Sequence, residues 1–230
     1  MTNLGVLVSG NGTNLQAIID AIEGGLLDSK VKVVISNNPG AFAIERAKRH
    51  NIPTEIVSNK TFPAKEDYDR RLVEILKEHS VDLVILAGFM RILTHVLINA
   101  FPMRIMNIHP ALLPAFPGLN VQKKALEHGV KFSGATVHFV DEGIDTGPII
   151  IQAVVPVYDD DTEEILSARI LQEEHRIYPQ AVKLFAEGRL EVKGRRAIIK
   201  DSPTTEGAME NPSVTMFKEM DECLSKSSKK

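Results

Sequence analysis

The segment LGVLVSGNGTNLQAIIDAIEGG, residues 4–25, joins a short apolar run to an amphipathic stretch through a turn that contains two glycines. The run LGVLVS (4–9) is apolar and rich in branched side chains, which predicts a buried strand. NLQAIIDAIEGG (14–25) has apolar residues at helical spacing and ends in glycines, which predicts a helix that stops there. A strand joined to a helix by a tight turn is the first part of a β-α-β unit.

The same alternation continues through the first half of the chain. Strands are predicted at VKVVISN (31–37), Thr54–Val57, VDLVILAG (81–88) and RIMNIH (104–109), and helices at 41–50 and 67–80. The run at 81–88 is apolar without alternation, as in strands that are buried on both faces. This order predicts an α/β fold with a doubly wound, mostly parallel sheet.

The second half of the chain has a different pattern. SGATVHFV (133–140) and PIIIQAVVPV (148–157) flank the turn EGIDTG, which predicts two antiparallel strands. Asp161 and Glu164 have the spacing of a capping box in front of a long helix over 162–187. The segment RLEVKGRRAII then predicts a small hairpin that closes the fold.

Length and charge limit the class of protein. The 230 residues suit a single domain over 1–200, and the polar, aperiodic composition of 201–230 predicts a tail. The formal net charge of −3 argues against a nucleic-acid partner, because a phosphate backbone requires a clustered basic face. We expect the short basic run at Lys193, Arg195 and Arg196 to be a solvated turn.

The single cysteine, Cys223, excludes an intrachain disulfide and leaves no cysteine pair for a zinc site. The beginning of the chain, MTNLGVLVSG, lacks a basic n-region, and its apolar run is only about five residues long. We therefore expect neither a signal peptide nor a membrane span, and a location in the reducing cytoplasm.

The turn SGNGTN (9–14) is the first candidate site. Its glycines permit a tight turn, and the N–H groups that begin the following helix can bind an anion. An ordinary glycine-rich turn is the alternative. A dinucleotide site fits poorly, because Leu15 stands where that motif has its third glycine, and Ser36, Asn37 and Asn38 stand where an acidic residue usually holds the ribose. A monophosphate suits the loop better.

The segment MNIHPALLPAFPG (106–118) is the second candidate site. On an extended segment Asn107 and His109 point to one face, and Met106 and Ile108 point to the other. An amide beside an imidazole suits acyl transfer, because Asn107 can stabilise a developing oxyanion and His109 can move a proton. The prolines stiffen the loop, and one X–Pro bond is a candidate for the cis form. The alternative is a structural Asn–His pair that holds the proline loop.

The segment VDEGIDTGP (140–148) places Asp141, Glu142 and Asp145 in a region rich in turn residues. Acidic residues in such a region are usually exposed turn formers. A carboxylate brought against His109 would favour the imidazolium form of the ring. Spacing alone leaves open whether Asp145 reaches His109, so this pairing is a hypothesis.

The segment AGFMRIL (87–93) is an apolar loop with one cation, Arg91. It suits either a pocket for a flat heterocycle or packing into the core. The loops at 9–14, 88–93 and 107–117 each follow a predicted strand, and in open α/β sheets ligands bind at the carboxyl ends of the strands. We therefore expect the three loops to converge on one site.

Together these segments closely resemble the phosphoribosylglycinamide formyltransferases over about residues 3–192. The shared motifs are, in order, SGNGTNLQAIID, AGFMRIL, NIHPALLP, GATVHFVDEGIDTGPII and EEHRIYP. The Asn-x-His-Pro motif with a later Asp is similar to the wider group of folate formyltransferases, whereas SGNGTNLQ and EEHRIYP point to this member. The resemblance implies a Rossmann-like formyltransferase fold with a phosphate-binding half, 1–100, and a folate-binding and catalytic half, 101–200.

In this family the formyl donor is 10-formyltetrahydrofolate, and the motifs imply that Asn107, His109 and Asp145 are the catalytic residues. The substrate's amine is expected to attack the formyl carbon directly. Asn107 and His109 would stabilise the tetrahedral oxyanion, and a proton would move to the folate nitrogen. One such positioned donor is typically worth ~3 kcal/mol of transition-state stabilisation. We expect no metal, small-molecule substrates, no nucleic acid or membrane partner, and a monomer or homodimer.

The resemblance also implies binding residues for each substrate. The phosphate of the ribonucleotide would be held by Gly12, Thr13 and Asn14, and the glycinamide part would contact Glu174. The implied folate site comprises Lys65, Met90, Arg91, Ile92, Leu93, Val140, Asp141, Glu142, Gly143 and Ile144. Thr146 departs from the pattern, because some relatives have a glycine there, and we expect little consequence.

Two other kinds of protein remain as alternatives. One is a formyltetrahydrofolate hydrolase or another folate formyltransferase, such as one acting on methionyl-tRNA. The tRNA-directed enzyme is expected to carry an extra C-terminal barrel and a basic surface, and the hydrolase an added N-terminal regulatory domain. The other is a non-catalytic nucleotide-binding module, which has no need for Asn107, His109 and Asp145 together.

Overall fold

The computed structural model describes residues 1–201, and strand and helix alternate along the chain up to residue 139. The strands are β1 Thr2–Val8, β2 Ser29–Ser36, β3 Thr54–Ile56, β4 Leu83–Leu86, β5 Ile105–His109, β6 Phe132–Phe139, β7 Ile149–Pro156, β8 Leu190–Lys193 and β9 Arg196–Ile199. The helices are α1 Thr13–Glu23, α2 Phe42–Arg49, α3 Lys65–Glu78, α4 His95–Ala100, α5 Val121–Glu127 and α6 Glu163–Ala186, with a 3₁₀ turn, η1, at Asn59–Thr61.

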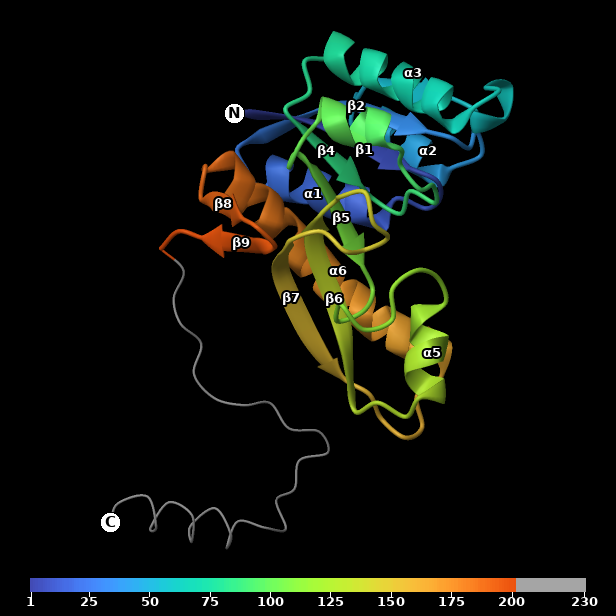
Figure 1. Ribbon diagram of the computed structural model, residues 1–230, viewed down its shortest axis with the longest axis vertical. Coiled ribbons are helices and arrows are strands. Elements are labelled where there is room, and N and C mark those ends of the chain that lie inside the picture. The colour runs from blue at the N-terminus through green and yellow to red at the C-terminus, as the bar shows by residue number, and fades with distance from the viewer. Residues whose placement is uncertain (202–230) are drawn as a thin grey trace, which may run out of the picture.

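The strands form one sheet in the order β3-β2-β1-β4-β5-β6-β7-β9-β8 (Figure 1). The strands from β3 to β5 in this order are all parallel. β6 runs antiparallel to both β5 and β7, and β8 and β9 form the antiparallel hairpin at the edge. The prediction of a mostly parallel, doubly wound sheet with an antiparallel C-terminal part is confirmed.

Helices cover both faces of the sheet because the side chains of each strand alternate between two cores. On β1, Leu4, Val6 and Val8 pack into the core that holds α1, α2 and α6. Leu7 points the other way, into the core beneath α3 and α4. This burial on both faces explains why the central strands read as continuous apolar runs.

The structure adds three short elements that the sequence pattern did not predict, namely η1, α4 and α5. It also corrects the start of the long helix. The helix cap is Thr162, whose hydroxyl group accepts a hydrogen bond from the Ile165 N–H group, and not Asp161. The Asp161 carboxylate instead binds the Arg169 guanidinium, with an Oδ2–Nη1 distance of 2.6 Å, because Arg169 lies two turns into the helix and reaches back to it.

Two further expectations concern the ends of the chain and the membrane. No helix within residues 1–201 combines the length and the apolar character needed to cross a membrane. The expected polar tail begins at the last described residue, and positions 202–230, including Cys223, lie outside the described residues.

Candidate active site

The candidate site lies on the face of β5 and β6 that points away from α6. Met106 and Ile108 are buried in the core that contains α6. Asn107 and His109 therefore project from the opposite face, as the alternation of β5 predicts. Across the antiparallel pair, Asn107 lies opposite His138, and His109 lies opposite Thr136. Four polar side chains are thus gathered on one small area of the sheet.

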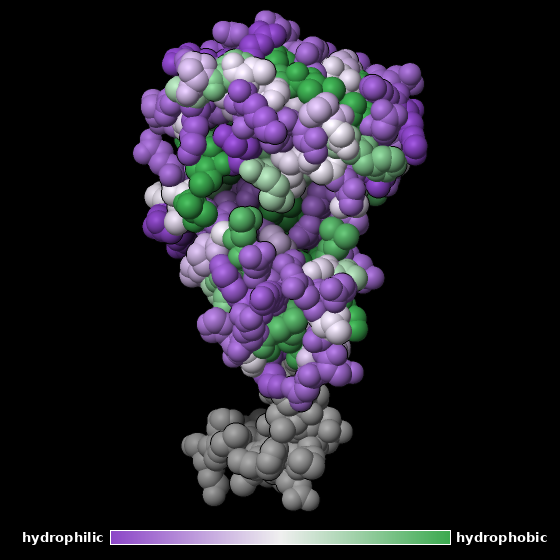
Figure 2. Space-filling view, turned by 90° about the vertical axis from the view of Figure 1, so that its right-hand side faces the viewer, coloured by the Kyte–Doolittle hydropathy of each residue, from purple (hydrophilic) through white to green (hydrophobic). Residues whose placement is uncertain are grey.

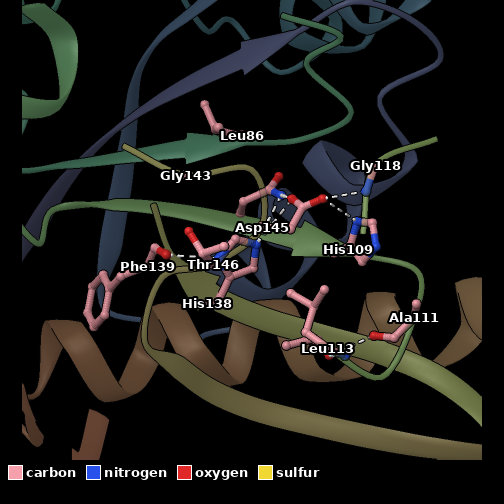
Figure 3. A network of polar contacts seen from close by, with 12 residues as sticks. Leu86, His109, Ala111, Leu113, Gly118, His138, Phe139, Gly143, Asp145 and Thr146 are labelled. Carbon is pink, nitrogen blue, oxygen red and sulfur yellow. Dashed lines mark hydrogen bonds and ion pairs between the residues drawn. The ribbon is translucent and has the colours of Figure 1, made fainter. Parts of the chain in front are cut away.

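The loop between β6 and β7 brings Asp145 onto this polar area (Figure 3). Its carboxylate lies 3.4 Å from His109 Nδ1, and it accepts hydrogen bonds from Asn107 Nδ2 at 3.5 Å and from the Gly118 N–H group at 2.9 Å. Asp145 has a φ of 54°, in the left-handed region that few non-glycine residues adopt. The structure therefore brings together the three side chains that the sequence motifs singled out, including the Asp145–His109 pair that spacing left open.

His138 belongs to the same cluster, although the sequence reasoning did not select it. Its Nε2 lies 3.2 Å from Asn107 Nδ2 and 3.8 Å from the Asp145 carboxylate, and its Nδ1 lies 2.8 Å from the carbonyl oxygen of Phe139. Burial lowers the pKa of the His138 imidazole, which favours the neutral ring. The available signal was the alternation of SGATVHFV, which places His138 on the same strand face as Thr136.

The two histidines of the cluster have different hydrogen-bond environments. Both ring nitrogens of His109 face acceptors, with Nε2 2.9 Å from the Phe116 carbonyl oxygen and Nδ1 near the Asp145 carboxylate. Each contact can be a hydrogen bond that the ring donates. His138 faces the amide nitrogen of Asn107 on one side and a carbonyl oxygen on the other, which fits a neutral ring protonated at Nδ1. The cluster can therefore hold one proton-donating ring beside one neutral ring.

A buried threonine fixes the proline loop that follows His109. The Thr136 hydroxyl group donates to the Ala111 carbonyl oxygen at 2.6 Å and accepts from the Leu113 N–H group at 3.1 Å. Gln152 supports the same place by donating to the Leu113 carbonyl oxygen at 2.9 Å. The Leu113–Pro114 bond is cis, so the expectation of one cis proline in this loop is confirmed.

The turn at 9–14 lies beside the loop that follows β4. The Ser9 N–H group donates to the Gly88 carbonyl oxygen, and the Met90 N–H group donates to the Ser9 hydroxyl group. β1, β4 and β5 are parallel neighbours, so the loops at their carboxyl ends share one edge of the sheet. The expected convergence of the three loops is therefore seen in the structure.

A buried pair joins the turn at 9–14 to α6. Asn14 Nδ2 donates to the Glu174 carboxylate at 2.7 Å, and both side chains are buried. Burial raises the pKa of the Glu174 carboxyl group, and the hydrogen bond from Asn14 opposes that rise. The Oδ1 atom of Asn14 is buried without a hydrogen-bond partner within the described residues. The Oδ1 atom of Asn14, at the start of α1, is therefore available to accept a hydrogen bond.

Several residues of the expected folate site are exposed apolar side chains. Met90, Ile92 and Ile144 are 66%, 64% and 54% exposed. Figure 2 shows hydrophobic side chains around a hollow near the middle of the face that it presents. The Nε atom of Arg91 is buried without a hydrogen-bond partner in the described part of the chain. Exposed apolar groups beside an unused polar donor suit a flat ring with polar edges.

The remaining residues of the expected folate site differ in their surroundings. Leu93 and Val140 pack into the core beneath α3 and α4. The Asp141 carboxylate organises its own loop, because it accepts from the Gly143 N–H group at 3.1 Å and from the Thr146 hydroxyl group at 2.6 Å. Glu142 and Lys65 are exposed, the latter at the first residue of α3.

The turn between β8 and β9 touches the loop that carries Asp145. Lys193, Arg195 and Arg196 are exposed, as expected for a solvated turn, but Arg195 Nη2 also donates to the Thr146 carbonyl oxygen at 3.1 Å. Thr146 thus has contacts through both its hydroxyl group and its carbonyl group. Within residues 1–201 no group of three or more His, Cys, Asp or Glu side chains is arranged to hold a metal ion.

The polar cluster, the glycine-rich turn and the sheet topology together define a formyl transferase domain. The Formyl transferase family model matches residues 2–182, and the chain belongs to that family. It is 45% identical over 190 residues to the phosphoribosylglycinamide formyltransferase of Escherichia coli (strain K12), which covers 83% of this chain and 90% of that protein. The resemblance noted in the sequence motifs is thereby confirmed.

Other relatives differ in length. The chain is 49% identical over 185 residues to the trifunctional purine biosynthetic protein adenosine-3 of Drosophila melanogaster, a match that covers 80% of this chain and 14% of that protein. Among solved structures, it is similar to glycinamide ribonucleotide transformylase 1 from Symbiobacterium toebii, with a TM-score of 0.86 and 54% identity over 86% of this chain and 94% of the other. The described fold is therefore that of the glycinamide ribonucleotide transformylases.

Proposed function

We propose that this chain transfers a formyl group from 10-formyltetrahydrofolate to the amine of phosphoribosylglycinamide, a step of de novo purine biosynthesis. One observation carries the proposal. Four polar side chains meet near the carboxyl ends of the parallel strands, where the glycine-rich turn also lies; they are Asn107, His109, His138 and Asp145. The names of the relatives in Escherichia coli and Symbiobacterium toebii support the same reaction.

The acceptor is proposed to bind between the start of α1 and α6. The turn at Gly12, Thr13 and Asn14 offers N–H groups at a helix N-terminus, which suit the phosphate of a ribonucleotide. Asn14 and Glu174 are hydrogen-bonded to each other, and the unused Oδ1 of Asn14 is available to a hydroxyl or amine donor of the acceptor. Polar groups that are buried and unpartnered in a free site usually gain partners from the ligand.

The formyl donor is proposed to lie against the exposed apolar side chains of the loops at 87–93 and 140–148. Met90, Ile92 and Ile144 would contact the faces of the pterin ring, and the buried Nε of Arg91 would donate to a polar ring edge. Lys65 is exposed at the start of α3, where a cation suits the carboxylates of the folate tail. The residues present therefore fit the donor chemically.

We propose direct transfer through a tetrahedral intermediate. The acceptor amine forms a bond to the formyl carbon, and that carbon's double-bonded oxygen takes the displaced electron pair as an oxyanion. Asn107 would exchange its contact with His138, and His109 its contact with the Phe116 carbonyl oxygen, for a hydrogen bond to the oxyanion. Asp145 would hold both side chains in place. When the intermediate collapses, the bond between the formyl carbon and the folate nitrogen breaks, and the proton lost by the amine is delivered to that nitrogen.

The test is a transfer assay with purified protein, phosphoribosylglycinamide and 10-formyltetrahydrofolate, in which release of tetrahydrofolate is followed. His109→Ala is expected to lower kcat by about 10²- to 10⁴-fold, since it removes both an oxyanion donor and a proton carrier. His95→Ala is the matched control, because His95 is exposed on α4.

Three results would contradict parts of the proposal. Release that does not require the ribonucleotide would indicate a hydrolase. Binding of both substrates without any release would indicate a nucleotide-binding module. Equal activity of His109→Ala and His95→Ala would remove His109 from the reaction.

A further inference from the structure

We infer that Arg46 of α2, assisted by His175 of α6, binds the phosphate group of the acceptor substrate. This inference rests on the proposed function, because it assigns a cation to the proposed phosphate site. The sequence reasoning placed only Gly12, Thr13 and Asn14 there. The turn SGNGTN contains no cationic side chain.

Arg46 is fixed directly against the turn. Its Nε donates to the carbonyl oxygen of Asn11 at 2.8 Å, and its Nη1 donates to Gln16 Oε1 at 3.3 Å. The guanidinium also lies over the ring of Phe42, 4.9 Å from the ring centroid. These three contacts restrain the planar group, and its Nη2 makes no hydrogen bond within residues 1–201. The guanidinium is therefore restrained and still has N–H groups available for a ligand.

The packing of α2 explains why Arg46 must lie at this turn. Gly12 has a φ of 69°, and a Cβ atom built there would lie 2.5 Å from the Cβ of Ala43. The turn is thus in contact with the first turn of α2, and the Ala43 N–H group donates to the Gly10 carbonyl oxygen. Arg46 lies three residues after Ala43 on the same helix face. Its position relative to the turn is consequently set by backbone packing.

A groove between α1 and α6 opens at the same place. It has a volume of about 670 Å³, and its lining includes Thr13, Gln16, Arg46 and His175. The Nε2 atom of His175 is buried and has no hydrogen-bond partner within the described residues. An anion at the groove end nearest Thr13 would satisfy this nitrogen when it carries a proton, together with the unused N–H groups of Arg46.

The charges around the groove favour Arg46 over its neighbours as the phosphate ligand. Arg176 and Lys183 also line the groove, but each is paired with a carboxylate of its own helix, Glu173 and Glu187 respectively. Arg46 has no ion-pair partner within residues 1–201. A phosphate monoester carries a charge of about −1.5 to −2 near pH 7, and a guanidinium group matches its oxygens in geometry and charge. A phosphate would thus supply the missing ion-pair partner of Arg46 and accept hydrogen bonds from its guanidinium group.

The experiment compares two acceptors, phosphoribosylglycinamide and its dephosphorylated riboside, in wild type, Arg46→Gln and Arg46→Lys. Arg49→Gln is the matched control, because Arg49 lies on the same helix and over the same Phe42 ring but has no contact with the turn. We expect Arg46→Gln to lower kcat/KM for the phosphorylated acceptor by about 10- to 100-fold, the loss of one or two charge-assisted hydrogen bonds. Arg46→Lys should recover part of that loss.

The riboside distinguishes phosphate binding from a merely structural role of Arg46. If Arg46 binds the phosphate, kcat/KM for the riboside should change little in Arg46→Gln, and inhibition by inorganic phosphate should weaken in parallel with the loss on the phosphorylated acceptor. Equal losses on both acceptors would overturn the inference, as would unchanged kinetics or an equal effect of Arg49→Gln. His175→Gln should show the same acceptor dependence to a smaller extent.

The wild type separates this inference from the function on which it rests. Formylation of both acceptors with equal kcat/KM would refute a phosphate site at the turn while leaving formyl transfer intact. Formylation of neither acceptor would refute the proposed function.

Discussion

We expect the buried carboxyl group of Glu174 to lower the stability of the fold at neutral pH, and Glu174→Gln tests this expectation. Glu174 is only 7% exposed and receives one hydrogen bond, from Asn14 Nδ2 at 2.7 Å. Burial raises the pKa of this carboxyl group, so its ionised form is disfavoured in the folded state. Glutamine keeps the shape of the side chain and an oxygen that can accept from Asn14 Nδ2, and it removes the charge.

We expect Glu174→Gln to raise the free energy of unfolding by about 1–2 kcal/mol at pH 8, since a buried charge is removed. For a chain of this size the corresponding rise in Tm is roughly 2–8 °C. The folded-state pKa lies above the unfolded value of 4.5, so the wild type loses stability as the pH rises through 4.5 and up to the folded-state pKa. The advantage of the variant should therefore be smallest near pH 4 and largest at pH 8.

Urea unfolding of wild type and Glu174→Gln between pH 4 and 8 measures this effect. Glu173→Gln is the control, because Glu173 is the preceding residue of α6 and forms a surface ion pair with Arg176. Glu174→Gln should also raise KM for the ribonucleotide about tenfold or more, if the Glu174 carboxylate accepts hydrogen bonds from that substrate. A variant that is no more stable than wild type at pH 8, or whose advantage does not vary with pH, would refute the reasoning.

Three further changes test other parts of the structure. Arg195→Ala removes the hydrogen bond to the Thr146 carbonyl group. Loss of one hydrogen bond to a substrate-binding loop should raise KM for the folate by about twofold to fivefold in steady-state kinetics. An unchanged KM would show that the loop does not need this hydrogen bond. Tyr178→Phe removes a fully buried hydroxyl group that donates to backbone carbonyl groups of β4 and β5, and urea unfolding should show a loss of about 1–2 kcal/mol. Burial lowers the pKa of His138 below 6.5, so the free energy of unfolding should fall as the pH falls through 6.5 toward the folded-state pKa. His138→Gln should reduce this dependence of stability on pH. A dependence that persists in the variant would assign it to other groups.

Most of the sheet could be predicted because its strands are short apolar runs separated by helices with clear periodicity. The segments at 31–37 and 148–157 correspond to β2 and β7 within one or two residues at each end. The short helices α4 and α5 were missed, because six or seven residues give too few turns for an apolar period to stand out. The cap of α6 was misplaced by one residue because acidic and hydroxyl residues compete as caps in the segment DDDTEE.

The residues of the candidate site could be predicted where they lie close together within one sequence motif. Asn107 and His109 are two residues apart on a strand, so their shared face follows from the backbone alone. His138 was missed because its contact with Asn107 depends on the register between β5 and β6, which are separated by more than 20 residues. Arg46 was missed for a similar reason, since only the packing of α2 on the turn at Gly12 places it beside the phosphate site.

Local sequence is thus sufficient for the α/β class, the order of the elements and the two motifs at 9–14 and 106–118, because periodicity and turn chemistry act over a few residues. The contact of Asp145 with His109, the lowered pKa of His138 and the pairing of Asn14 with Glu174 require the folded chain. These features depend on strand register, on helix packing and on burial from water, and each is set by residues far apart in the sequence.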